Sequence, residues 1–249
     1  MKIIRTDREL LAPTVDATLR EAGHELVLLP DGAPEKELIS HVRDADLLLM
    51  CYQPVTRAVI EAATRLKGVI KYGVGVDAID IPAASERGIP VVNIPEYAER
   101  SVAEGAFALM MVLARKLPPL LEQMGREGWA WPEPSWMGSD IAGQTVGIIG
   151  LGRIGKSFAQ IAGAGFQARV LAYDPYVSRE GMNRLGVMKI DRLEDLLPQA
   201  DFVGANIDGL TARFRHQIPT DFTCCRDRER LILTLDDSLT ILAIRAMRV

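Results

Sequence analysis

Cysteine is scarce in this chain, which has three cysteines among 249 residues. Two of them, Cys224 and Cys225, are adjacent, which is not the spacing of zinc ligands, and no histidine stands close to them in the sequence. A disulfide framework would need more cysteines, distributed along the chain. We therefore expect neither a disulfide scaffold nor a metal site.

Charge of one sign and long apolar runs are also lacking. Lys and Arg number 29 against 33 Asp and Glu, which gives a formal net charge of −4. No stretch collects Lys or Arg in the way that binding to a phosphate backbone requires. The apolar stretch Phe107–Ala114 is far too short to span a bilayer, and Lys2 and Arg5 interrupt any signal-peptide region. We expect a cytoplasmic protein without nucleic-acid or membrane partners.

What is present is an ordinary globular balance, with 48% apolar and 25% charged residues. Over the first hundred residues, short β-rich runs alternate with helical ones. Such alternation predicts βαβ units and a parallel sheet. The expected strands lie in 1–7, 25–30, 45–52, 68–76 and 89–95, with helices up to residue 23 and over 35–43.

Two helix starts are marked by capping residues. Asp80 can cap a helix that has Pro82 in its first turn, and Ser101 with Glu104 has the pattern of a capping box. The second start precedes a long helix, which we expect to connect two domains. Its apolar face is predicted to comprise Val102, Ala106, Leu109, Met110 and Leu113.

Residues 122–142 interrupt the pattern with three tryptophans, prolines and glycines, and we expect an ordered surface loop. Its tryptophans, Trp129, Trp131 and Trp136, are predicted to pack a domain junction. The alternation then resumes. Strands are expected in 145–150, 168–174, 187–190 and 200–207, and helices in 153–164, 179–185 and 192–199. The predicted fold class is α/β with doubly wound parallel sheets.

A glycine motif joins the first of these later strands to its helix. Gly150 permits the tight turn, Gly152 lets a pyrophosphate approach the backbone, and Gly155 lets the helix pack closely on the strand. The helix N-terminus offers free N–H groups to phosphate oxygens. The motif therefore predicts a dinucleotide-binding Rossmann unit.

The next strand ends in Asp174, which lies 19 residues beyond Gly155 (174 − 155). An acid at this distance accepts hydrogen bonds from the adenosine ribose and repels a 2′-phosphate. The predicted cofactor is therefore NAD in preference to NADP. Arg179 lies five residues further on, and we interpret it as a solvated side chain.

Three segments together resemble the D-isomer-specific 2-hydroxyacid dehydrogenases. They are YGVGVDAID (72–80), VNIP (92–95) leading into SVAE (101–104), and GQTVGIIGLGRIGK (143–156). The resemblance covers about residues 1–218. It implies a flavodoxin-like substrate domain over 1–100, an NAD-binding Rossmann domain over 101–218 that includes the connector helix but lacks its last strands, and an active site in the cleft between them. Residues 219–249 form an unmatched tail.

The resemblance also implies roles for individual residues. The backbone at Val74 and Gly75 would receive the substrate carboxylate, although this glycine-rich turn is either an anion-binding nest or a plain turn on sequence alone. Besides the glycines, the implied cofactor contacts are Val102 near the nicotinamide, Arg153, Ile154, Tyr173 and Asp174, with Ile207 and Asp208 beside the adenine-ribose half.

The match degrades after Asn206 and ends near Pro219. In this family the catalytic Arg, Glu and His follow that point, so we expect this chain to lack them, through a shifted reading frame or a shortened gene. The histidines present, His24, His41 and His216, are interpreted as surface or packing residues. Residues 230–235 and 239–244 are predicted to be two strands around a turn, with a short helix as the alternative.

The leading hypothesis is an NAD-dependent oxidoreductase of this family that moves hydride between NAD(H) and a small 2-oxo or 2-hydroxy acid, in a chain that is itself inactive. The alternative is a non-catalytic, NAD(H)-responsive binding or regulatory protein. A different Rossmann oxidoreductase is disfavoured by the loop at 72–80. A homodimer through residues 101–121 is open, since the apolar residues there would equally serve an intrachain junction.

Overall fold

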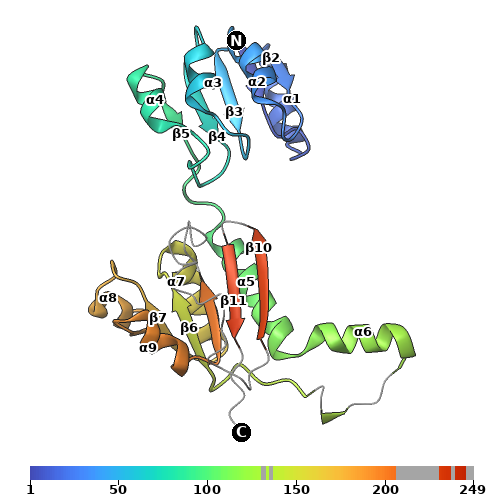
Figure 1. The fold of residues 1–249 in the computed structure, drawn as a ribbon, viewed down its shortest axis with the longest axis vertical. Coiled ribbons are helices and arrows are strands. Elements are labelled where there is room, and N and C mark those ends of the chain that lie inside the picture. Colours follow the sequence, from blue (N-terminus) through green and yellow to red (C-terminus); the bar gives the residue numbers. More distant parts are fainter. Residues whose placement is uncertain (130–132, 135–136, 206–229, 237–238, 245–249) are drawn as a thin grey trace. The chain divides into compact units, whose positions relative to one another are not determined.

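The computed structural model describes residues 1–129, 133–134, 137–205, 230–236 and 239–244, the last two ranges by their backbone. The chain forms two compact units, Met1–Tyr97 and a second unit that begins at Ala98 (Figure 1). No helix in the described ranges is both long enough and apolar enough to cross a membrane.

The first unit is a five-stranded parallel sheet with strand order β2-β1-β3-β4-β5. Its strands are β1 Lys2–Arg5, β2 Glu25–Leu28, β3 Leu47–Met50, β4 Gly68–Lys71 and β5 Val91–Val92. Its helices are α1 Pro13–Glu21, α2 Glu35–Val42, α3 Arg57–Ala62 and α4 Ile81–Glu86. This is the predicted doubly wound α/β architecture, in the flavodoxin-like order.

The strands of this sheet are continuous apolar runs, so both faces of the sheet need a cover of helices. Ile3, Ile4, Leu48 and Val69 are fully buried, as expected where helices cover a parallel sheet. The predicted cap of α4 is confirmed, since the Asp80 carboxylate accepts a hydrogen bond from the Ala83 N–H at 2.8 Å.

The second unit contains a four-stranded parallel sheet in the order β8-β7-β6-β9. The strands are β6 Thr145–Ile149, β7 Arg169–Tyr173, β8 Met188–Lys189 and β9 Phe202–Ala205. The helical segments are α5 Glu99–Ala114, α6 Leu117–Glu127, α7 Arg153–Gln160 with the π-turn η2 Ile161–Gly165, α8 Arg179–Asn183, α9 Leu193–Leu196 and the 3₁₀ turn η3 Leu197–Gln199. Strands β8-β7-β6 have the order of one mononucleotide-binding half of a Rossmann fold, and β9 takes the place of the first strand of the other half, as predicted.

The predicted capping box at Ser101 is wrong. Helix α5 begins at Glu99, its N-cap Ala98 makes no side-chain cap, and Ser101 lies inside the first turn. Glu104 instead accepts a hydrogen bond from Arg100 Nε at 2.9 Å, an i,i+4 pair. The buried face is also rotated from the predicted one; its residues are Ala103, Ala106, Phe107, Met110 and Ala114.

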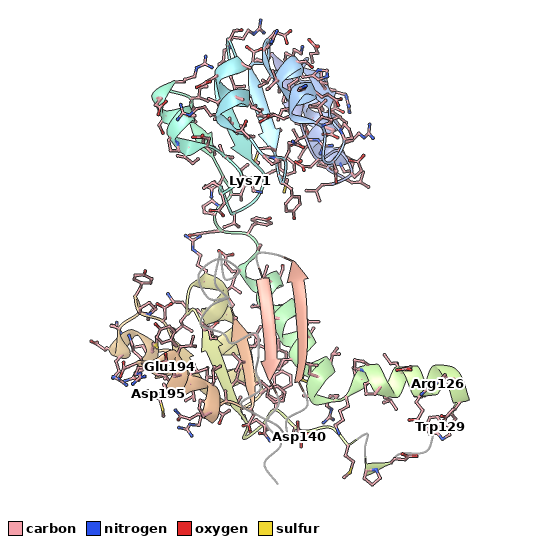
Figure 2. All side chains as sticks on the ribbon, in the orientation of Figure 1. Lys71, Arg126, Trp129, Asp140, Glu194 and Asp195 are labelled. Carbon is pink, nitrogen blue, oxygen red and sulfur yellow. The ribbon has the colours of Figure 1, made fainter. Side chains whose placement is uncertain are left out.

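The predicted loop over 122–142 begins later than expected. Lys116 adopts a left-handed conformation (φ 53°) and ends the first helix, and α6 then continues to Glu127 with no buried residue. Trp129, just beyond α6, is 74% exposed and so does not pack within the second unit; its predicted place at a domain junction stays a prediction (Figure 2). Trp131 and Trp136 lie outside the described residues.

The predicted strand pair in the tail is confirmed. Strands β10 Arg230–Asp236 and β11 Leu239–Ile244 pair antiparallel, and β11 lies beside β9 (Figure 1). The hairpin therefore runs along the edge of the four-stranded sheet that the sequence leaves open, although β10 and β11 form a hydrogen-bonded sheet of their own.

Candidate functional site

The turn between β6 and α7 is built by two glycines that serve the fold. Gly150 has a φ of +84°, which L side chains rarely adopt, and its N–H donates to Tyr173 O at 2.9 Å. A Cβ on Gly155 would lie 2.2 Å from Gly150 O. Helix α7 can therefore lie this close to the turn only because residue 155 is glycine.

Gly152 differs from both of these glycines. Its φ of −72° suits any residue, and a Cβ built on it would meet no atom within 4 Å. The fold itself does not require glycine here. The open space lies at the N-terminus of α7, where the sequence pattern places a pyrophosphate.

Helix α7 is fixed by its apolar side and leaves its N-terminus for a ligand. Phe158 and Ala159 are buried in the core of the second unit, and Ile154 is half-buried against it. No side-chain cap is recorded at the N-terminus of α7 within the described residues. N–H groups of a helix's first turn, with the helix dipole behind them, form a site for phosphate oxygens. Arg153, at the same end, is exposed.

The Asp174 carboxylate, at the end of β7, is tied to the glycine turn. Its Oδ2 accepts from the Leu151 N–H at 2.8 Å, and its Oδ1 from the N–H groups of Tyr176 at 2.8 Å and Val177 at 3.2 Å. A carboxylate offers about four acceptor positions. The three bonds leave room for a further donor, such as a ribose hydroxyl.

These features together fit a dinucleotide: a helix N-terminus, an open glycine and an oriented acid stand at the carboxyl ends of adjacent strands. Two other predicted contacts, Tyr173 and Val102, are half-buried in β7 and α5. Ile207 and Asp208 lie outside the described residues.

In the first unit, the loop after β4 turns its peptide N–H groups outward. Gly73 O accepts from the Ile94 N–H at 3.0 Å, and Val74 O accepts from Asn93 Nδ2 at 2.7 Å. In a trans peptide the N–H points opposite to the C=O. The N–H groups of Val74 and Gly75 therefore point away from the residue 93–94 segment, and no acceptor for them is recorded among the described residues. This geometry favours the anion-binding nest over the plain turn.

A buried cation beside this loop was missed by sequence reasoning. Lys71 ends β4, is 7% exposed, and donates from Nζ to Cys51 O (Figure 2). Its Nζ lies 3.2 Å from the position that a Cβ of Gly73 would occupy and 5.2 Å from the centroid of the Tyr52 ring. The only sequence signal is one charge at the end of an apolar strand. Lys71 thus places a positive charge beside Gly73, the residue before Val74 and Gly75.

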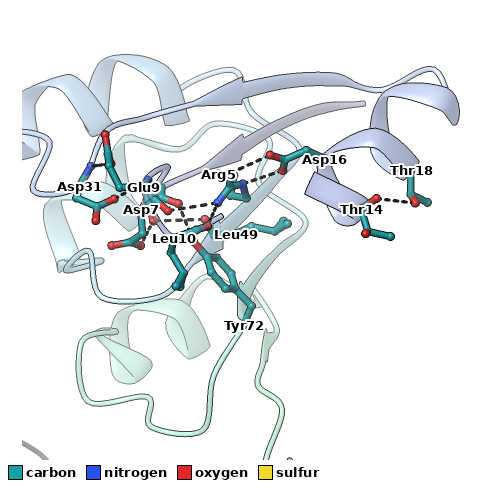
Figure 3. A network of polar contacts seen from close by, with 11 residues as sticks. Arg5, Asp7, Glu9, Leu10, Thr14, Asp16, Thr18, Asp31, Leu49 and Tyr72 are labelled. Carbon is teal, nitrogen blue, oxygen red and sulfur yellow. Dashed lines mark hydrogen bonds and ion pairs between the residues drawn. The ribbon is translucent and has the colours of Figure 1, made fainter. Parts of the chain in front are cut away.

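A buried polar network holds in place the loop that follows β3 and begins at Cys51 (Figure 3). Asp7, at a φ of +55°, accepts with Oδ2 from the N–H groups of Cys51 at 2.8 Å and Tyr52 at 3.1 Å. Arg5 pairs with Asp16, with Nε 2.9 Å from Oδ1. Tyr72 donates its hydroxyl to Thr6 O at 2.7 Å, and burial raises the pKa of Tyr72 to about 12.

No described histidine reaches this edge of the first sheet. His24 lies in the turn before β2, and His41 lies near the end of α2, which leads into β3; both are half-buried. They sit toward the amino ends of the strands, whereas the Gly73 loop follows a carboxyl end. His216 lies outside the described residues. Within the ranges that the structure describes, no group of three His, Cys, Asp or Glu could hold a metal.

The sequence profile described as D-isomer specific 2-hydroxyacid dehydrogenase, catalytic domain, matches residues 6–218. The chain belongs to this family. The resemblance predicted from the sequence is confirmed, and the match ends where the predicted tail begins.

Relatives and solved structures agree with this assignment. D-3-phosphoglycerate dehydrogenase from Methanocaldococcus jannaschii is 39% identical over 201 residues, which is 80% of this chain and 37% of that protein. The TT0316 protein from Thermus thermophilus has a TM-score of 0.75 at 30% identity, covering 84% of this chain and 65% of that one. D-lactate dehydrogenase from Aquifex aeolicus, complexed with NAD and lactic acid, has a TM-score of 0.69 at 26% identity, covering 83% and 60%. The chain thus spans less than two thirds of these proteins.

Proposed function

We propose that the second unit binds NAD(H), with the pyrophosphate at the N-terminus of α7 and the adenosine ribose at Asp174. The observation that carries the proposal is the open space at Gly152, because neither the φ of this residue nor packing against protein atoms requires glycine at that position. The NAD complex of the Aquifex aeolicus dehydrogenase supports it.

We further propose that the loop of Val74 and Gly75 binds the carboxylate of a small 2-oxo or 2-hydroxy acid. Its outward N–H groups and the Lys71 ammonium would hold that carboxylate, and Asn93 would hold the loop. Bound NADH supplies hydride to C2 of such an acid. The chain's own task is to bind and orient the two molecules.

The 249-residue chain by itself is expected to lack reductase activity. Reduction needs an acid to protonate the carbonyl oxygen and a cation to polarise it. The family's Arg, Glu and His would fall beyond residue 218, where the family match ends. Absence of the acid costs about 10² to 10⁴ in rate, and absence of the cation a similar further factor.

Fluorescence titration of the full 249-residue chain tests binding. We expect saturable NADH binding that is tighter than NADPH binding, because Asp174 would repel a 2′-phosphate. Tighter NADPH binding, or none to either dinucleotide, would contradict the proposal. A separate assay with NADH and a panel of 2-oxo acids tests turnover; a rate above about 1 s⁻¹ would show that the tail supplies a catalytic set.

Helix α6 is proposed to pair with a second copy of the chain. It projects from the second unit (Figure 1) and has no buried residue. Its apolar residues Leu117, Leu120, Leu121 and Met124 recur at the spacing of one helix side. Leu117 and Leu121 are 36% and 65% exposed. Such a stripe is typical of a helix that packs on a partner. Sedimentation of the wild type and of Leu121→Glu tests the homodimer, which only the wild type should form.

A further inference from the structure

Two cationic side chains lie beside the end of β7 that carries Asp174. Lys189 donates from Nζ to the carbonyl oxygens of Asp174 at 3.2 Å and Val177 at 2.6 Å. Arg179, the first residue of α8, donates from Nη1 to Lys189 O at 3.2 Å, and its Nη2 pairs with Asp191. A chain of contacts therefore runs from Asp174 through Lys189 to Arg179.

The two cations are held with very different strength. Lys189 is half-buried, and its two carbonyl partners belong to the turn that presents the Asp174 carboxylate, so it serves the structure. The Arg179 and Asp191 side chains are 56% and 66% exposed. For an exposed ion pair, the paired state is favoured over the unpaired state by no more than about fivefold. Arg179 can therefore exchange Asp191 for a stronger anion.

A 2′-phosphate is such an anion. It would project from the ribose that Asp174 is proposed to bind, and it would meet the Asp174 carboxylate there. The arginine guanidinium is the side-chain group that matches phosphate oxygens in paired hydrogen bonds. Arg179 stands five residues beyond Asp174, in the segment that follows the strand. A cation of the kind that an NADP site needs is thus present in the segment after β7, linked through Lys189 to the backbone of Asp174.

We propose that Arg179 is a latent 2′-phosphate ligand. The preference for NAD then comes from the Asp174 charge, which repels the phosphate, while Asp191 occupies the guanidinium. Without the charge at Asp174, the site accepts NADP(H) through Arg179. This inference rests on the proposed dinucleotide site and adds the residue that would determine its specificity.

Dinucleotide titrations of five forms of the full chain test this proposal: wild type, Asp174→Asn, Asp174→Asn with Arg179→Gln, Asp174→Asn with Asp191→Asn, and Arg179→Gln alone. Asparagine keeps the size of Asp174 but only one of its two oxygen acceptors, so the backbone N–H bonds to the other oxygen are lost. Measurable NADH binding therefore serves as the check that the turn is retained in each form. Circular dichroism verifies the fold of each form. Each is titrated with NADPH and NADH by fluorescence, at low and high salt.

Asp174→Asn is expected to bind NADPH at least about tenfold more tightly than the wild type, the scale of a hydrogen bond between charged groups. Adding Arg179→Gln should remove most of this gain in NADPH affinity, together with the salt dependence of the gain. Adding Asp191→Asn should increase the NADPH affinity of Asp174→Asn by up to about fivefold. Arg179→Gln alone should leave NADH binding unchanged. Equal NADPH affinity of Asp174→Asn with and without Arg179 would overturn the inference. Failure of every form to bind NADH or NADPH would overturn the dinucleotide site itself.

Discussion

The two sheets of this chain each present a glycine-rich turn at a carboxyl end, but the turns are built in different ways. The turn after β6 leads directly into α7, so a helix N-terminus and the open Gly152 face the ligand. The turn after β4 has no such helix, and its N–H groups are oriented by distant contacts from Asn93 and Ile94, with Lys71 beside them. The glycine pattern predicts both turns, but whether the second is an anion-binding nest or a plain turn depends on contacts from residues distant in the sequence.

Gly155→Val should have the largest effect in the β6–α7 turn, because Gly155 is needed for the fold and not only for ligand binding. Its Cβ would lie 2.2 Å from Gly150 O, which is backbone and cannot move aside. We expect the free energy of unfolding of the second unit to fall by about 3 kcal/mol or more. Urea denaturation measures it, with Gly165→Val as the control, because a Cβ at Gly165 meets nothing within 4 Å. Equal stability of the two variants would refute the close packing of α7.

Removing the acid next to the turn should have a smaller effect, on binding. Asp174→Ala is expected to weaken NAD by about 1–3 kcal/mol through loss of a charge-assisted hydrogen bond. Isothermal titration calorimetry with NAD gives the value, and Glu180→Ala, which removes an exposed acid of α8, is the control. Unchanged NAD affinity in Asp174→Ala would place the ribose elsewhere.

The turn in the first unit should be independent of this site. Asn93→Ala removes the bond to Val74 O and is expected to lower the free energy of unfolding of the first unit by about 1 kcal/mol. NADH affinity should remain that of the wild type. Urea denaturation and an NADH titration measure both quantities; a loss of NADH affinity in this variant would show that the two turns are coupled.

Much of the fold could be predicted because it is specified locally. Apolar runs mark the buried strands, and the Asp80 cap is a short-range signal that the structure confirms. Ser101 and Glu104 do not mark the start of α5, which lies at Glu99 without a side-chain cap, and Glu104 pairs with Arg100 instead. The boundary between α5 and α6 lies at a single left-handed residue, Lys116, which the sequence pattern does not mark.

The candidate site likewise has some parts that are specified locally and others that depend on contacts distant in the sequence. The positions of Gly150, Gly155 and Asp174 follow from spacing along one βαβ unit, and the structure brings them together. Lys71 and its partner Cys51 are 20 residues apart and meet only because β3 and β4 are neighbours. No local pattern in the sequence links two such residues.

The most direct test of the central claim is an NADH titration of Gly152→Val beside Gly165→Val. Valine at residue 152 meets no protein atom, so the fold should lose only about 1 kcal/mol, from a poorer helix cap. The side chain would, however, occupy the proposed place of the pyrophosphate. We predict that Gly152→Val stays folded and loses NADH binding by more than about 100-fold, the scale of a severe steric overlap, while Gly165→Val binds like the wild type. Normal NADH binding by folded Gly152→Val would contradict this prediction.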